Sequence, residues 1–314
     1  MTLSIHRLVS YPERRSPLNM SLFFLKVLVN SILFFAVFAH SQAPKSVFDS
    51  KGMVASRSAI ASEVGAKILA SGGNAIDAAV SVGFALAVTY PSAGNLGGGG
   101  FMVIRLADGK LIANDHREKA PGKATRDMYL DAQGEIVDGL STKSHLASGV
   151  PGTVADLIDV LEAYGSMELA EVIQPAIDLA KDGFILDEDL AGQFKRRLES
   201  FSNYPASLRV FSVDGEPYET GDRFSQPDLA ATLERIKLAG KRGFYAGETA
   251  DLIVAEMKNG GGIISIEDLK DYESKWRRPI MGDYRGYKVV SMPPPSSGGV
   301  LLVQMLNMLE PYDL

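Results

Sequence analysis

Four consecutive glycines at residues 97–100 stand directly before two extended apolar runs, and this combination constrains the fold more than any other feature of the chain. The runs cover residues 101–106 and 110–113, and Asp108-Gly109 between them has residue types that tolerate the positive φ of a tight primed turn. The sequence therefore predicts a β-hairpin entered through a glycine loop. The glycines either leave room for a ligand or a neighbouring chain segment, or serve simple turn chemistry.

Arg117 follows the second extended run, in the sequence Asp115-His116-Arg117-Glu118-Lys119, and would stand at a strand end. A guanidinium is planar, always charged and able to grip both oxygens of a carboxylate, whereas a lysine supplies only a point charge. Arg117 is therefore a candidate carboxylate-binding residue. An arginine after a strand also serves as a surface ion-pair partner, and the residues alone leave both interpretations open.

Helical periodicity recurs along the rest of the chain, and together with the extended runs it predicts a mixed α/β fold. One helix is marked by Ile60, Val64 and Ile68 and ends at Gly72-Gly73. The next helix has a narrow face of small residues that would let it approach a sheet closely, namely Ala75, Ala78, Ala79 and Val82. Further apolar stripes predict core-facing helices at Val154, Leu157, Ile158 and Leu161, at Leu190, Phe194 and Leu198, and at Leu229, Leu233 and Ile236.

The C-terminal part is predicted to contain two strands around a turn, within residues 277–292, and then a helix at residues 300–309. Ser296-Ser297, followed by two glycines, offers hydroxyls and free amides at the start of that helix. A helix start of this kind can bind an anion, or its serines can simply cap the helix.

Composition narrows the classes of function. With 46% hydrophobic and 22% charged residues, a chain of 314 residues can bury a large core, as one large domain or two. A net charge of -6 without a basic stripe argues against nucleic acid as a partner. Zero cysteines exclude disulfides and thiolate chemistry, and four widely separated histidines show no metal-ligand spacing. No metal and no other cofactor is predicted.

Residues 1–43 are predicted to form a secretory signal peptide, in which basic residues precede an apolar run at residues 27–39. That run is shorter than the ~20 residues needed to cross a bilayer. Small residues follow it, and we expect cleavage near residues 41–43. The mature chain, residues 44–314, would then be exported to the periplasm or the extracellular space, with an uncleaved membrane anchor as the alternative. Met20 is an alternative start that preserves the export prediction.

Five motifs occur in one order and together carry a family resemblance. They are residues 72–79, residues 97–102, Arg117-Glu118-Lys119-Ala120-Pro121, residues 144–153 and residues 292–299. In this order they resemble the γ-glutamyltransferase family, also called γ-glutamyltranspeptidase or glutathione hydrolase. The resemblance begins near residue 51 and covers the large-subunit portion of a precursor that cuts itself into a large and a small subunit.

The resemblance implies an α/β fold of the N-terminal-nucleophile hydrolase type, a stacked αββα sandwich whose sheets the small subunit completes. The family nucleophile is a threonine that self-cleavage exposes in a Thr-Thr-His context, and its own amino group can act as the base. No Thr-Thr-His occurs in this chain, so we expect the nucleophile to lie beyond Leu314. The chain would then be truncated before the small subunit, with no catalytic residue of its own and inactive alone.

The implied reaction is γ-glutamyl transfer and glutathione hydrolysis through a γ-glutamyl-enzyme intermediate, which water or an amino acid or peptide acceptor resolves. Arg117 would bind the α-carboxylate of the glutamyl group. Glu118 would buttress Arg117 or the neighbouring subunit, with a plain exposed acid as the alternative. Two rival functions remain, a cephalosporin or glutaryl acylase of the same architecture and a non-catalytic γ-glutamyl-binding module. Arg117-Glu118 favours glutamyl recognition.

Overall fold

Helices and short antiparallel strands alternate along residues 48–313, which the computed structural model describes. The predicted signal peptide and Leu314 lie outside the described residues. The boundary at residue 43 and the nucleophile expected beyond Leu314 therefore stay predictions. Residues 51–314 form the unit described below. Among the described residues, no helix is both long and apolar enough to cross a membrane.

The elements follow the chain in this way. The helices are α2 (Ala59–Ala70), α3 (Ala75–Thr89), α4 (Leu140–Lys143), the 3-10 helix η1 (His145–Ala147), α5 (Thr153–Tyr164), α6 (Leu169–Asp182), α7 (Glu188–Phe201), α8 (Pro205–Phe211), α9 (Pro227–Ala239), α10 (Arg242–Tyr245), α11 (Glu248–Gly260), α12 (Ile266–Lys270) and α13 (Ser297–Leu309). The strands are β1 (Phe101–Arg105), β2 (Leu111–Asp115), β3 (Phe184–Ile185), β4 (Arg223–Phe224), β5 (Lys275–Arg277), β6 (Ile280–Tyr284) and β7 (Tyr287–Ser291).

The first two helices confirm one prediction and correct another. α2 ends as predicted, because the amides of Gly72 and Gly73 bond back to carbonyls in its last turn and Gly72 adopts a positive φ of 98°. The predicted narrow face of α3 is wrong, since Ala75 and Ala79 are exposed while most of the other residues of α3 are buried. α3 packs mainly against the helices α2, α5 and α6, because it is apolar around almost its whole circumference.

Asp77 ties the start of α3 to the loop before α6. Its fully buried carboxylate accepts four hydrogen bonds, from the amides of Asn74, Ser166 and Met167 and from the Ser166 hydroxyl. Burial pushes the pKa of Asp77 upward, but these hydrogen bonds outweigh burial and leave the pKa below its ordinary value. The ionised carboxylate therefore fixes where α3 begins.

β1 and β2 form the predicted hairpin, and β5 pairs with the other side of β2. The turn differs from the prediction. Only Gly109 has a positive φ, of 88°, and the Leu106 carbonyl accepts from the Gly109 amide while the Leu106 amide donates to Lys110. The connection is a three-residue loop closed by a glycine, because Asp108 does not adopt the left-handed conformation that a primed turn needs. β1 is left at the edge of this sheet.

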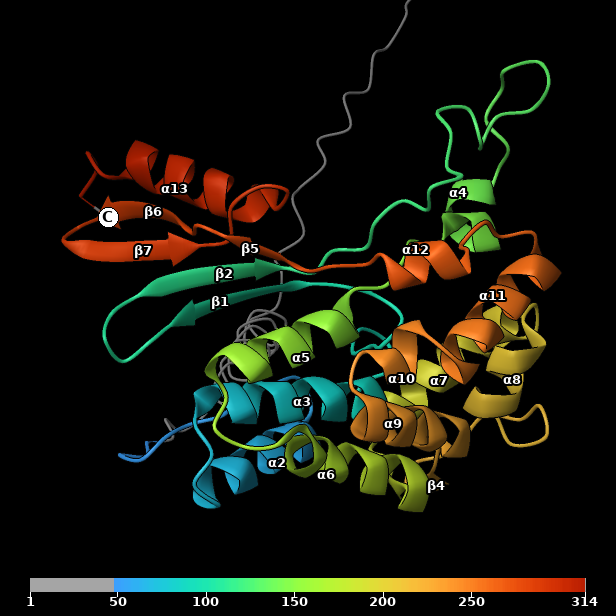
Figure 1. Ribbon diagram of the computed structural model, residues 1–314, viewed down its shortest axis with the longest axis horizontal. Coiled ribbons are helices and arrows are strands. Elements are labelled where there is room, and N and C mark those ends of the chain that lie inside the picture. The colour runs from blue at the N-terminus through green and yellow to red at the C-terminus, as the bar shows by residue number, and fades with distance from the viewer. Residues whose placement is uncertain (1–47, 314) are drawn as a thin grey trace, which may run out of the picture. The chain divides into compact units, whose positions relative to one another are not determined.

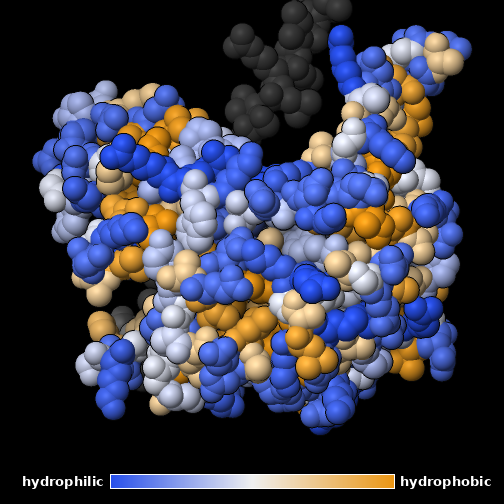
Figure 2. All heavy atoms as spheres, viewed as in Figure 1, coloured by the Kyte–Doolittle hydropathy of each residue, from blue (hydrophilic) through white to orange (hydrophobic). Residues whose placement is uncertain are grey.

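β6 and β7 are the two predicted C-terminal strands, and they turn at Arg285-Gly286, where both residues have a positive φ. α13 packs on this hairpin and begins at Ser297, slightly earlier than predicted. Several large apolar side chains of this region are exposed, including Tyr287 at 76% and Met308 at 68%. Figure 2 shows apolar atoms at the surface over α13 and the β6–β7 hairpin.

In Figure 1 the elements follow one another as layers, with α13 above the β6–β7 hairpin, the β1–β2 hairpin next, and α5 and α3 beneath. The main core lies in the helical layers, where the predicted stripes of α5, α7 and α9 are buried or half-buried. The mixed α/β class predicted from the sequence is therefore observed. β2 ends at Asp115, two residues before Arg117.

Candidate active site

Residue 117 lies immediately past the end of the β1–β2 ladder. Gly100 and His116 exchange backbone hydrogen bonds of 3.3 and 3.1 Å, which extend the hairpin by one pair. The Arg117 amide donates to Asp115 Oδ1 at 3.1 Å, and the Arg117 carbonyl accepts from the Tyr272 hydroxyl at 2.8 Å. Both backbone groups of Arg117 are thus bonded to side chains.

The side chain of Arg117 remains largely open to solvent. It is 55% exposed, its Nε lies 3.2 Å from Glu118 Oε2, and its guanidinium lies 5.6 Å from the centre of the Phe101 ring. The two terminal nitrogens make no hydrogen bond within residues 48–313. A half-exposed pair of neighbours contributes little stability, so the ion pair with Glu118 leaves Arg117 able to bind a ligand.

Arg117 borders a pocket of about 720 Å³. The pocket is lined by Gly97, residues 117–121, Ala124, Thr125, Met128, Tyr129 and residues 146–149. Lys119 supplies a second cation, and its Nζ lies 4.6 Å from the centre of the Tyr272 ring. Burial, and then the nearby charge of Lys275, lowers the pKa of Lys119. The site therefore combines two cations with one carboxylate, an arrangement suited to an anionic or zwitterionic ligand.

Two glycines of the tetraglycine, Gly99 and Gly100, allow the chain around His116 and Arg117 to approach closely. A Cβ on Gly99 would collide with the backbone carbonyl of His116, and a Cβ on Gly100 would lie 2.8 Å from the His116 ring nitrogen Nε2. A Cβ on Gly152, from the loop before α5, would collide with the same His116 carbonyl and with the Tyr272 hydroxyl. For Gly99 and Gly100 the observed role is room for a neighbouring segment, whereas Gly97 lines the Arg117 pocket and a Cβ there would meet no atom within 4 Å.

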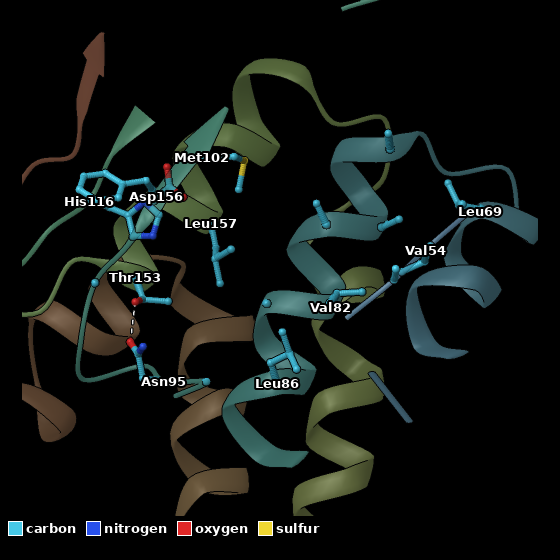
Figure 3. A pocket seen from close by; sticks show the side chains of 18 of the residues that line it. Val54, Leu69, Val82, Leu86, Asn95, Met102, His116, Thr153, Asp156 and Leu157 are labelled. Carbon is cyan, nitrogen blue, oxygen red and sulfur yellow. Dashed lines mark hydrogen bonds and ion pairs between the residues drawn. The ribbon is translucent and has the colours of Figure 1, made fainter. Parts of the chain in front are cut away.

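His116 points away from the Arg117 pocket and forms a buried pair with Asp156 of α5. His116 Nδ1 lies 2.9 Å from Asp156 Oδ2, but the two atoms lack the alignment of a hydrogen bond. The pair lines a largely apolar pocket of about 440 Å³, in which Thr153 donates a 2.6 Å hydrogen bond to Asn95 (Figure 3). Among the described residues, no three His, Asp or Glu side chains come together to hold a metal ion.

The serines before α13 cap that helix. Ser296 Oγ accepts from the Gly298 amide at 3.3 Å, so the capping interpretation is the one observed. Sequence reasoning identified Arg117 and Glu118 but missed three residues that contact or support them, namely Asp115, Tyr272 and Arg277. Strand alternation could have placed Asp115 on the same face of β2 as Ala113. No local pattern places Tyr272 or Arg277 there, although Arg277 lies opposite Ala113 in the sheet.

Comparison with known proteins identifies the family. Residues 61–314 match the sequence model of the γ-glutamyltranspeptidase family. This chain belongs to that family. It is 54% identical over 265 residues to the glutathione hydrolase proenzyme of Escherichia coli (strain K12), covering 84% of this chain and 46% of the proenzyme. It is 40% identical over 276 residues to the acylase ACY 1 proenzyme of Pseudomonas sp. (strain V22), covering 86% of this chain and 50% of that proenzyme.

The fold comparison agrees with the family assignment. The crystal structure of Helicobacter pylori γ-glutamyltranspeptidase matches with a TM-score of 0.84 and 50% identity, over 86% of this chain and 78% of that chain. The predicted family and the predicted α/β fold of the N-terminal-nucleophile hydrolase type are confirmed. The chain spans about half the length of the proenzymes it matches.

Proposed function

We propose that the protein carrying this chain cleaves γ-glutamyl amides such as glutathione, and that Arg117 binds the α-carboxylate of the glutamyl group. The observation that supports this role is the position of Arg117 at a pocket, with its backbone bonded on both sides and its two terminal nitrogens unused. Two parallel N–H donors match the two oxygens of a carboxylate. The family to which the chain belongs supports the reaction class.

In the proposed reaction a threonine beyond Leu314 attacks the γ-carbonyl carbon. The bond from carbon to the threonine oxygen forms, the amide C–N bond breaks, and the amine leaves with a proton supplied by the enzyme. Water or the amino group of an amino acid or peptide then attacks the ester and releases the threonine. The residues of this chain contribute binding and orientation, which raise the effective concentration of the reacting groups.

We propose a small subunit of the same precursor as the partner of this chain. β1 is at the edge of its sheet and its Val103 is 43% exposed. A pocket of about 520 Å³ separates the start of α3 from β1, and the exposed apolar residues of α13 lie on the same unit. Edge strands and apolar faces of this kind are normally covered. A small subunit that adds strands and apolar area would complete the αββα sandwich.

We also propose that residues 1–43 direct export to the periplasm or the extracellular space and that residues 44–314 are the mature part. The support is the sequence pattern of the N-terminus. Uncleaved retention as an anchor is the competing outcome. N-terminal sequencing of the protein recovered from a periplasmic fraction decides between cleavage and retention. An N-terminus near residue 42 or 44 supports cleavage, and an N-terminus at residue 1 or 20 refutes cleavage.

An acylase is the second candidate function, because the chain is 40% identical to an acylase proenzyme. A glutaryl group keeps the carboxylate that Arg117 would bind and lacks only the α-amino group of a γ-glutamyl group. Contrary to the expectation from the sequence, Arg117 therefore does not separate the two functions, because both groups carry the carboxylate; the α-amino group does. A substrate pair that differs in this amino group alone is the appropriate test.

The experiment uses a precursor in which this chain is joined to a small subunit, either its own or that of the E. coli relative. Release of the aniline is measured from γ-glutamyl-anilide and from glutaryl-anilide after self-cleavage has been verified. Faster turnover of γ-glutamyl-anilide is expected, and a preference for glutaryl-anilide would favour the acylase. Cleaved protein that turns over neither substrate but binds glutathione would instead support the binding module.

A further inference from the structure

The place of Arg117 in space depends on a residue far along the chain. Asp115 is 7% exposed, and its two carboxylate oxygens have different partners. Oδ1 accepts a hydrogen bond from the Arg117 amide at 3.1 Å. Oδ2 accepts a hydrogen bond from Arg277 Nε at 2.8 Å and lies 2.6 Å from Arg277 Nη2. Arg277 lies on β5, so the third strand of the sheet is linked through one carboxylate to the backbone of Arg117.

The sheet register makes this contact possible. Arg277 lies opposite Ala113 of β2, and Asp115, two residues on, points to the same face. The two side chains are diagonal neighbours, which long side chains can bridge. Arg277 is only 32% exposed and Asp115 is nearly buried, so water screens this pair less than it screens the pair between Arg117 and Glu118.

The opposite side of Arg117 is fixed by Tyr272. Its hydroxyl donates to the Arg117 carbonyl at 2.8 Å, and its ring stacks on Tyr245 at an interplanar angle of 4°. Tyr245 is itself anchored, since its hydroxyl donates to the Pro151 carbonyl at 3.0 Å. The peptide groups before and after the Arg117 Cα are therefore held by two separate side chains. One is Asp115, which Arg277 holds in turn, and the other is Tyr272.

We propose that Arg277 is a positioning residue that fixes the Arg117 guanidinium for carboxylate binding, with Tyr272 as its counterpart on the carbonyl side. This inference rests on the proposed role of Arg117. The Arg117 side chain is half exposed, and among the described residues its ion pair is with Glu118 and its cation–π contact is with Phe101, so its direction depends largely on its backbone. A binding group that shifts by a fraction of an ångström loses much of its contribution to binding. The contacts that hold the Arg117 backbone therefore set how precisely its guanidinium is placed.

The test compares three anilides in the self-cleaved enzyme. γ-Glutamyl-anilide and glutaryl-anilide carry the carboxylate, whereas γ-aminobutyryl-anilide lacks it. Arg277→Met should raise KM for the first two about tenfold, with little change in kcat, and should leave the third within about twofold. Arg277→Lys should restore part of the loss, because it keeps a cation beside Asp115. Tyr272→Phe, which removes only one hydroxyl, should raise KM for the same two substrates by about threefold.

Two other arginines serve as matched controls. Arg235 lies on α9, away from the proposed site. Its side chain is 24% exposed and forms an ion pair with Glu248 at 3.0 Å. Arg278 adjoins Arg277 and is exposed. Arg235→Met should lower the melting temperature without changing the ratio of the three KM values, and Arg278→Met should change neither. In an Arg117→Met background, Arg277→Met should have no further effect on KM.

Several results would overturn the inference. One is an equal rise in KM for all three substrates in Arg277→Met. Another is a ratio of the three KM values in Arg277→Met that matches the ratio in Arg235→Met. The third is an effect of Arg277→Met on KM that is just as large when Arg117 is already replaced. If the wild-type enzyme cleaves γ-glutamyl-anilide and Arg117→Met impairs it, any of these results refutes the role of Arg277 alone. If Arg117→Met has no effect, the proposed role of Arg117 fails and this inference fails with it.

Discussion

Replacement of Arg117 by lysine tests the proposed site most directly, because it keeps the charge and removes the planar fork. Glu118 occupies Nε at 3.2 Å, which leaves the two terminal nitrogens for a carboxylate. A lysine ammonium would replace two parallel bonds by one, and the loss of one charge-assisted bond amounts to about 1.5–3 kcal/mol. The side chain is 55% exposed, and solvent screening places the expected loss in the lower part of this range.

In kinetic terms, kcat/KM for γ-glutamyl-anilide should fall roughly 10–30-fold in Arg117→Lys, and γ-aminobutyryl-anilide turnover should not change. Self-cleavage should persist, because no carboxylate ligand takes part in it. Arg126→Lys is the matched control, since the Arg126 side chain is 95% exposed and lies 3.7 Å from Asp127. Unchanged γ-glutamyl turnover in correctly cleaved Arg117→Lys enzyme would mean that Arg117 is a structural residue and that the site assignment is wrong.

Three further predictions concern stability, measured by urea unfolding. Gly152→Ala should lower the unfolding free energy by about 1–3 kcal/mol, because the new methyl group would displace Tyr272; an unchanged midpoint would contradict the observed packing. His116→Ala should lower it by about 1–3 kcal/mol, since the buried Asp156 carboxylate would lose its nearest polar neighbour, and replacing both residues by apolar ones should lower it less. The pKa of Asp77 is lowered on folding, so its stabilising effect is present above the unfolded value of about 3.9 and is lost as pH falls through the folded pKa. Asp77→Asn should therefore flatten the decline in stability below about pH 4, and an equally steep decline would refute this.

The features that the sequence predicted correctly are those set by neighbouring residues. Gly72 ends α2 because only a residue free to adopt positive φ can close that helix, and the same requirement is visible in the sequence. The stripe of α5 predicted its buried face, since a period of 3.6 residues is a local property. Arg117 could be singled out because it directly follows a strand that alternation and turn residues had already marked.

The features that were missed depend on contacts between distant segments. The Tyr272 hydroxyl and the Arg117 carbonyl are 155 residues apart along the chain, and the Arg277–Asp115 pair spans 162. No local pattern specifies that residues 275–277 pair with β2. The prediction for α3 failed for a related reason, because small residues suggest close packing but do not say whether a sheet or a helix is the partner.

These long-range contacts have a consequence for how the site forms. β2 can build its hairpin with β1 from local sequence alone, but Arg117 is fixed only after β5 docks on β2 and brings Arg277 to Asp115. Tyr272 arrives with the same segment and closes on the Arg117 carbonyl. Any change that loosens β5 should therefore weaken carboxylate binding before it unfolds the helical core, because that core is built from α3, α5, α6 and α9 without β5. The geometry of the proposed carboxylate-binding site is thus set by β5, the strand of this sheet that is most distant along the chain, and Gly99 and Gly100 allow the segment around residue 117 to pack closely.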